Sequence, residues 1–205
     1  MRRDVRPRVS GPRTSTPLIA ALVLVGVFAA ALGVGQLLGI PLPSLDLGLR
    51  RHGEGMQPST PTRITIPTLG IRAGVVEVGQ APDGSIAPPA EDPAGSAGWF
   101  GQGPTPGEAG TAVIVGHVDT ATGPAVFAKL HELRPGKTIE VKRADKRTAT
   151  FAVDTVETFP KTAFPAQRVL TRTDTPQLAL ITCGGEWVGG HLGYADNVIV
   201  FAHLV

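Results

Sequence analysis

The stretch Leu178-Ala-Leu-Ile-Thr-Cys-Gly-Gly185 is an apolar run that ends at the only cysteine of the chain, Cys183. A second apolar run, Thr111-Ala-Val-Ile-Val-Gly-His117-Val-Asp119, leads into a histidine. Both runs are short and rich in β-branched residues, which is typical of buried strands. We therefore expect two strands that each deliver one half of a Cys–His pair, since an adjacent imidazolium favours the reactive thiolate. The alternative is that Cys183 is a small buried apolar residue, as free cysteines often are.

Further short runs with alternating apolar residues follow residue 62, and they predict an all-β sheet or barrel. Pro135-Gly136 and Ala144-Asp145-Lys146 supply turns between three of these runs. The Pro/Gly-rich stretch Ala81–Gly110 is expected to be mostly loop, with Trp99-Phe100 as an apolar anchor. One or two helical turns are expected at Ala125–Leu133, where apolar residues recur at three-residue spacing. The expected strands lie near Arg63–Ile66, Ala73–Val78, Ala112–Gly116, Thr138–Lys142, Thr148–Thr158, Leu178–Thr182 and Asn197–His203.

The N-terminal region has the features of a membrane anchor. Its apolar segment Leu18–Ile40 carries no charge and is long enough to cross a bilayer. Arginines dominate the residues before it, so the positive-inside rule predicts a cytoplasmic N-terminus. We expect a basic cytoplasmic tail (1–16), a transmembrane anchor (17–40), a Pro/Gly/Ser-rich linker (41–61) and an extracytoplasmic domain (62–205). The alternative is a signal peptide cleaved near Ala29-Ala30-Ala31.

Charge and cysteine content exclude several classes of function. From Pro58 onward the chain has 12 Lys and Arg against 14 Asp and Glu, a net charge of −2. This charge argues against nucleic-acid binding. A single cysteine cannot form an internal disulfide, and outside the cell it suggests an intermolecular bridge or a working thiol. Because the sequence lacks a Gly-rich phosphate loop, an HExxH motif and paired cysteines, we expect no cofactor and no metal site.

Two histidines are candidates for the base that would serve Cys183. His117 is the first, because it leaves an apolar strand into a Gly/Thr-rich loop, and His191 is the second, because it follows the cysteine by eight residues. Asp119 either orients His117 or opens a turn. Gly184-Gly185 either exposes backbone N–H groups to an oxyanion or forms a tight turn that ends the strand. The remaining histidines fall in the linker, the expected helical turn and the last strand (His52, His131, His203).

Three strings of the chain resemble the sortases, which are membrane-anchored cysteine transpeptidases that attach proteins to the bacterial cell wall. They are Gly116-His-Val-Asp-Thr-Ala-Thr-Gly-Pro-Ala-Val-Phe127, Ile181-Thr-Cys-Gly-Gly185 and Tyr194-Ala-Asp-Asn-Val-Ile-Val-Phe-Ala202. Within the family they are most similar to the class F group of actinobacteria. The resemblance runs from about Thr62 to the C-terminus. It implies a closed β-barrel of about eight strands with one or two short helices, and it implies that Cys183 and His117 are catalytic.

The chain departs from the family at one catalytic position. Most sortases place an arginine at the start of the last strand, where it holds the substrate and its oxyanion. Here that position falls on Asn197, with Ala195 two residues earlier on the same face. Asn197 could donate an N–H to the oxyanion or be a structural strand residue, and Arg168 or Arg172 could supply the missing guanidinium instead.

The resemblance implies that the enzyme cleaves an LPxTG-type sorting signal through a thioacyl-enzyme and joins the protein to a cell-wall amine. Its expected partners are secreted proteins with C-terminal sorting signals, a cell-wall precursor amine and the membrane, the last through residues 17–40. Its expected location is the cell membrane, with the catalytic domain outside. One alternative is a non-catalytic, membrane-tethered β-domain that binds peptides or wall components. Another is an exported cysteine hydrolase.

Overall fold

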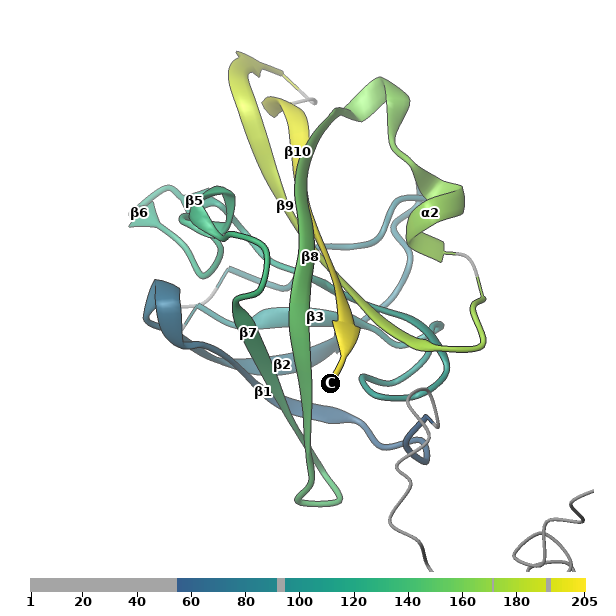
Figure 1. The fold of residues 1–205 in the computed structure, drawn as a ribbon. Coiled ribbons are helices and arrows are strands. Elements are labelled where there is room, and N and C mark those ends of the chain that lie inside the picture. Colours follow the sequence, from purple (N-terminus) through teal and green to yellow (C-terminus); the bar gives the residue numbers. More distant parts are fainter. Residues whose placement is uncertain (1–54, 92–94, 171, 191–192) are drawn as a thin grey trace, which may run out of the picture. The chain divides into compact units, whose positions relative to one another are not determined.

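The computed structural model describes residues 55–91, 95–170, 172–190 and 193–205. Eight strands form a closed barrel in the order β1-β2-β3-β4-β9-β10-β8-β7 (Figure 1), so the expected all-β barrel is confirmed. The neighbours β2–β3 and β4–β9 are parallel, and the other pairs are antiparallel. The barrel strands are β1 (Pro61–Ile66), β2 (Ile71–Val78), β3 (Ala97–Phe100), β4 (Gly110–Val115), β7 (Thr138–Arg143), β8 (Thr148–Pro160), β9 (Pro176–Gly189) and β10 (Gly193–Leu204).

Short elements connect the barrel strands. A small hairpin, β5 (Asp119–Thr120) with β6 (Gly123–Pro124), follows β4, and the 3-10 helix η2 (Leu130–Glu132) lies in the segment expected to be helical. The 3-10 helices η1 (Pro67–Leu69) and η3 (Lys161–Ala163) follow β1 and β8. The α-helix α2 (Ala166–Leu170) was not expected from the sequence, because its five residues are too few to show a helical period.

Two apolar clusters take up the side chains on the two faces of the barrel strands. The larger cluster fills the barrel and includes Ala112, Ile114, Leu178, Leu180 and Val200. Residues between these positions point to the outer face, because successive side chains of a strand alternate between faces. There they form a second cluster, which α2 covers with its one buried residue, Val169. The other buried members of this outer cluster are Val113, Val115, Ala179, Ile181, Ile199 and Phe201.

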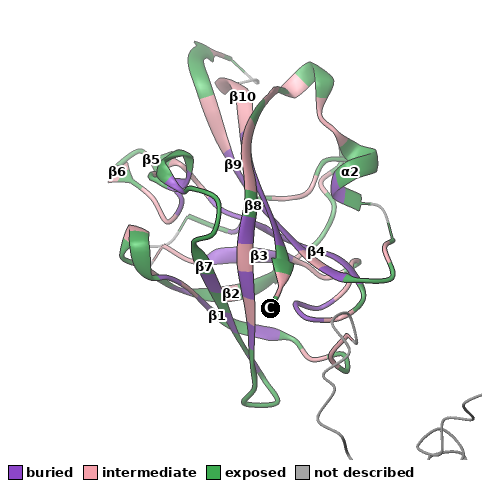
Figure 2. Ribbon diagram, in the orientation of Figure 1, coloured by how far each residue is buried: buried purple, intermediate pink, exposed green. Residues whose placement is uncertain are grey.

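Two expectations were wrong in detail. Trp99-Phe100 does not anchor a loop but belongs to β3, whose residues Ala97–Trp99 are buried between β2 and β4. Gly184-Gly185 does not turn the chain out of its strand, because β9 continues to Gly189. Figure 2 shows the consequence: the upper parts of β9 and β10 extend beyond the buried centre of the barrel as a partly exposed hairpin.

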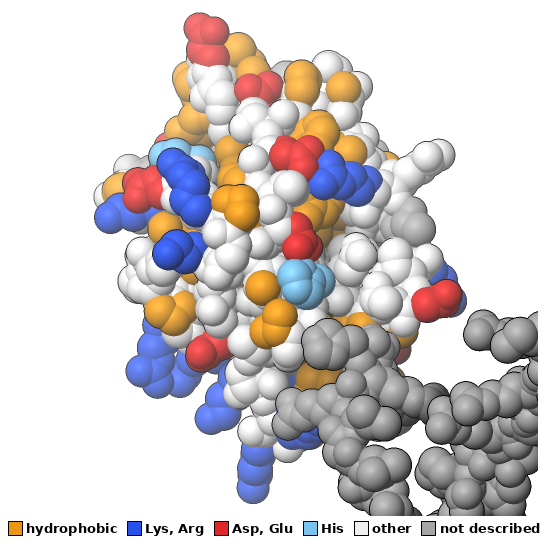
Figure 3. All heavy atoms as spheres, in the orientation of Figure 1, with side chains coloured by type: hydrophobic (Ala, Val, Ile, Leu, Met, Phe, Trp, Pro, Cys, Tyr) orange, Lys and Arg blue, Asp and Glu red, His pale blue; other side chains and the backbone are white. Residues whose placement is uncertain are grey.

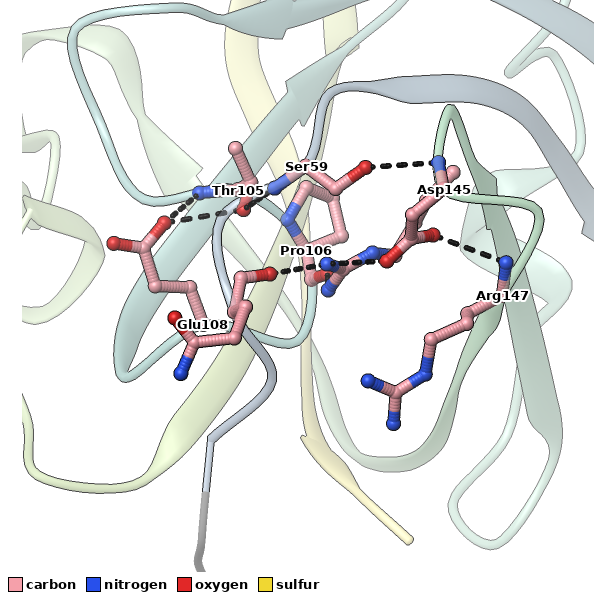
Figure 4. A network of polar contacts seen from close by, with 8 residues as sticks. Ser59, Thr105, Pro106, Glu108, Asp145 and Arg147 are labelled. Carbon is pink, nitrogen blue, oxygen red and sulfur yellow. Dashed lines mark hydrogen bonds and ion pairs between the residues drawn. The ribbon is translucent and has the colours of Figure 1, made fainter.

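Polar contacts fix the start of the described chain to the end of the barrel opposite the β9–β10 hairpin, and Figure 4 shows part of this network around Ser59 and Asp145. A buried arginine lies at its centre. The Arg143 side chain is fully buried and donates to the Pro106 carbonyl at 2.8 Å, to the Gln57 carbonyl, and to the Asp145 carboxylate at 3.1 Å. The Ser59 hydroxyl accepts the Asp145 N–H at 3.1 Å. These contacts join the residues before β1 to the β7–β8 turn, which lies at the bottom of Figure 1.

Within the described residues, no helix is long and apolar enough to cross a membrane. The expected anchor (17–40) and the second candidate base, His191, fall outside the described residues.

Candidate active site

The pairing of β4 with β9 places His117 and Cys183 next to each other. These strands are parallel, Val115 of β4 is the partner of Ile181, and the Gly116 N–H donates to the Ile181 carbonyl at 3.0 Å. His117 and Cys183 each follow two residues after these partners. Both are half-buried, and both line one open groove of about 600 Å³ at the upper end of the barrel. We call this the thiol groove.

The imidazole of His117 is held by a neighbouring backbone carbonyl. Its Nε2 lies 2.8 Å from the carbonyl oxygen of Pro89, a buried residue in the segment between β2 and β3. A carbonyl can only accept, so Nε2 carries the hydrogen, and in the neutral ring Nδ1 is then the basic nitrogen. The thiol of Cys183 is free of disulfides and makes no hydrogen bond to His117. Catalytic pairs without substrate are often longer than hydrogen-bond distance.

Asn197 of β10 is the direct cross-strand partner of Cys183. It lies on the outer face of β10 with Ile199 and Phe201, and Cys183 lies on the same face of β9 with Ile181. Side chains of directly opposite residues stand about 5 Å apart at Cβ, which is within reach of an amide N–H. The structure therefore brings Asn197 beside the thiol, at the position where the family resemblance implies an arginine.

Arg168 is engaged elsewhere and does not line the thiol groove. Its guanidinium forms two hydrogen bonds of 2.7 Å with the Glu157 carboxylate and stacks on the Phe201 ring at 3.8 Å from the centroid. The hydrogen bonds to Arg168 hold the pKa of Glu157 below its ordinary value, and the same contact raises the pKa of Arg168. Arg172 is exposed and does not line the groove either.

The structure adds an aromatic wall that the sequence did not predict. The Tyr194 ring meets the Trp187 ring edge to face, with centroids 5.0 Å apart, and both side chains line the thiol groove. The Tyr194 hydroxyl donates to the Asp119 carboxylate, which joins β10 to β5 across the groove. This hydrogen bond raises the pKa of Tyr194, and the nearby charge of Cys183 adds a smaller effect in the same direction. Asp119 thus binds Tyr194, and no hydrogen bond to His117 is present.

The hairpin that carries this wall exposes apolar surface. Trp187 is 64% exposed and Val188 is 55% exposed. In Figure 3 hydrophobic side chains gather at the top of the visible face, over the β9–β10 hairpin. Lys and Arg side chains lie along the left side and at the bottom of this face, with a few more on the right. The hairpin side of the groove is therefore apolar and aromatic, and the rest of its lining includes the charged residues Glu91, Asp119 and Lys161.

Packing explains the two glycines after the cysteine. A Cβ on Gly184 would lie 2.8 Å from Cγ2 of Val198. Gly185 has φ of +76°, and a Cβ there would run into the Asp196 carboxylate. Both positions therefore require glycine for the β9–β10 hairpin to form. Among the described residues, no group of three His, Cys, Asp or Glu side chains is arranged to hold a metal ion.

Comparison with known proteins identifies the family. The sequence model described as "Sortase domain" matches residues 64–205. No curated protein matches this chain.

Solved structures with the same fold include sortase A from Corynebacterium diphtheriae, at 19% identity and a TM-score of 0.54, with 73% of this chain and 62% of that chain covered. Sortase C-1 from Actinomyces oris is 18% identical with a TM-score of 0.53, and 70% of this chain and 72% of that chain are covered. Sortase C1 from Streptococcus agalactiae is 18% identical with a TM-score of 0.54, at coverages of 76% and 69%. The alignment thus spans less than two thirds of the C. diphtheriae chain. The family model matches most of the chain, and the barrel brings Cys183 and His117 into one groove. The chain therefore belongs to the sortase family.

Proposed function

We propose that this chain is a class F-like cysteine transpeptidase that acts on LPxTG-type sorting signals. The observation that carries the proposal is that Cys183 and His117, from strands far apart in the sequence, line one groove. The family is that of the sortases, whose members are cysteine transpeptidases. A further support is the position of Asn197, which is the direct cross-strand partner of Cys183 on β10.

In the first step, the thiolate of Cys183 attacks the carbonyl carbon of the Thr–Gly bond. The negative charge that develops on the carbonyl oxygen is stabilised by the side-chain amide N–H of Asn197. The C–N bond then breaks, and the imidazolium of His117 gives its proton to the departing amine. A thioester between the substrate and Cys183 remains.

In the second step, an amine of a cell-wall precursor attacks the thioester carbonyl. His117 accepts the proton of this amine, the C–S bond breaks, and the thiolate of Cys183 returns. Water in place of the amine gives hydrolysis. The Nε2–H of His117 is bound to the Pro89 carbonyl before substrate arrives, so proton transfer requires either Nδ1 or release of Nε2 from that carbonyl.

The enzyme is proposed to act at the outer surface of the cell membrane. Residues 17–40 would anchor it, residues 1–16 would lie in the cytoplasm, and residues 41–61 would link the anchor to the catalytic domain. The support is the uncharged apolar segment and the arginines that precede it. Its partners would be secreted proteins with C-terminal sorting signals.

The test is a reaction of the full-length chain with an LPxTG peptide, with and without an added amine. Intact mass spectrometry should show an acyl adduct that maps to Cys183, and chromatography should show the peptide–amine product. Cys183→Ala and His117→Ala should abolish the product. His131→Ala is the matched control, because His131 is exposed on η2 and does not line the thiol groove.

Two other outcomes separate the alternatives. A folded chain that forms no adduct with several sorting peptides, yet binds them equally well after Cys183→Ala, would be a binding domain. Cleavage whose products do not change with added amine would identify a hydrolase.

A further inference from the structure

A second groove meets the thiol groove at His117. It has a volume of about 350 Å³ and is formed by residues 70–73, residues 90–91 and 95–96, and the hairpin β5–β6 with the residues that follow it. In Figure 1 this hairpin stands above the turn that leads into β2. The two grooves share Glu91, His117 and Thr120, but Cys183 lines only the thiol groove. His117 is therefore accessible from two directions.

In a transfer reaction through a thioester, the acceptor must approach while the acyl chain still occupies its own site. After the first step the acyl chain stays attached to Cys183 and continues to occupy the thiol groove. The incoming amine must still reach the thioester with its N–H within hydrogen-bond distance of the base. The second groove leads to His117 without passing Cys183, so it can be filled while the acyl chain is in place.

The charges of the second groove select the kind of amine. Besides His117, its lining residues carry two ionisable side chains, Arg72 and Glu91. Both are exposed, and Arg72 forms no ion pair with any residue in the described part of the chain. Glu91 lies at the border with the thiol groove, where an ammonium group would arrive. A guanidinium with free donors binds a carboxylate in bidentate geometry.

We propose that the second groove binds the acceptor, and that the acceptor is a primary amine that also carries a carboxylate. Glu91 attracts the ammonium group toward His117, and Arg72 binds the carboxylate. His117 then takes the proton that the amine must lose before it attacks. This inference rests on the proposed function, because it assigns the second substrate of the same reaction.

The test compares two acceptors that differ in one group, Nα-acetyl-lysine and its carboxamide. Each is titrated into a reaction of the full-length chain with an LPxTG peptide, and the peptide–amine product is quantified against hydrolysis. The wild-type chain should be half-saturated by the carboxylate form at a concentration about fivefold lower than the amide form, as for a solvent-exposed ion pair. Arg72→Ala should bring this ratio to about one. Glu91→Gln should raise the half-saturating concentration of both acceptors.

Arg63→Ala is the matched control, because Arg63 is exposed on the neighbouring strand β1 and lines neither groove. It should keep the wild-type ratio. Equal use of both acceptors by the wild-type chain, or an unchanged ratio in Arg72→Ala, would overturn the inference. If both acceptors yield the peptide–amine product without the expected preference, the proposed function still stands and only this inference fails. If Cys183 is acylated but neither acceptor yields product, the chain is a hydrolase and both proposals fail. If Cys183 takes up no acyl group at all, the proposed function fails and this inference with it.

Discussion

Replacing Gly116 with alanine should damage both stability and catalysis, because this glycine separates β4 from His117. A Cβ at this position would lie 2.5 Å from Cδ2 of Phe127 and 2.7 Å from Cγ1 of Val126. The distance between the new Cβ and the Phe127 ring must widen to at least 3.0 Å. Both sides resist this movement, because Phe127 is fully buried and the Gly116 N–H is bound to the Ile181 carbonyl. Either Phe127 or the backbone that leads to His117 has to move.

The size of the effect follows from this crowding. Overpacking of a filled core costs about 1–3 kcal/mol, and we expect the upper end because Phe127 is fully buried and two side chains would be contacted at once. For a domain of this size the loss corresponds to a Tm lower by about 6–12 °C. A displacement of the base by up to about 1 Å should slow thioester formation by roughly 10- to 100-fold.

The assay for this prediction combines thermal unfolding with the rate of acyl-adduct formation at a temperature where the variant is folded. The matched control is Gly74→Ala on β2, because a Cβ there has only the Ser96 hydroxyl nearby, at 3.9 Å. Gly74→Ala should be about as stable and as active as the wild-type chain. A Gly116→Ala variant that equals Gly74→Ala in both measurements would refute the reasoning.

Three further predictions address other groups around the thiol groove. Asn197→Ala should slow adduct formation by about 100- to 1,000-fold, with little change in the peptide Kd, and an unchanged rate would show that the oxyanion is stabilised elsewhere. Tyr194 is the only tyrosine of the chain, so ultraviolet titration reports its pKa directly. That pKa should lie above the ordinary value of 10.0 and return toward it in Asp119→Asn, whereas no difference would disprove the hydrogen bond between them. Glu157→Gln should lower Tm by up to about 4 °C near pH 6, because a partly exposed ion pair contributes at most about 1 kcal/mol. Arg168 lowers the pKa of Glu157 in the folded state. The stabilisation by this ion pair is therefore fully present above the unfolded pKa of glutamate, near 4.3, and is lost as pH falls through the lower folded pKa. A Tm difference between Glu157→Gln and the wild-type chain that persists at pH 2–3 would contradict this assignment.

The barrel was largely predictable because its strands have strong local patterns. Alternating β-branched residues predicted seven of its strands, and all seven lie within or overlap strands of the structure. The exception was β3, a four-residue strand in a stretch rich in proline and glycine. Its burial comes from its neighbours β2 and β4, and such tertiary contacts leave no periodic signal in so short a segment.

The site was predictable in part for the same reason. Cys183 and His117 were singled out because each ends an apolar run, but their proximity depends on the parallel pairing of β4 with β9, which no local pattern reveals. The wall formed by Trp187 and Tyr194 depends on β9 continuing through two glycines that looked like a turn. The second groove depends on three separate segments that meet only in the folded domain.

The Arg143 network gives the domain a mechanical property. Under the proposed function, a substrate bound covalently at Cys183 and an anchor that holds the chain before Gln57 would pull the domain from two ends of the barrel. The first described contacts to bear that force are the hydrogen bonds of the buried guanidinium to the Gln57 and Pro106 carbonyls. Behind them, β1 is hydrogen-bonded to β2 on one side and to β7 on the other, so it has no free edge from which to be peeled. Resistance to such a pull is set by the rate of forced unfolding rather than by equilibrium stability, so in an anchored enzyme the Arg143 hydrogen bonds would slow unfolding under tension.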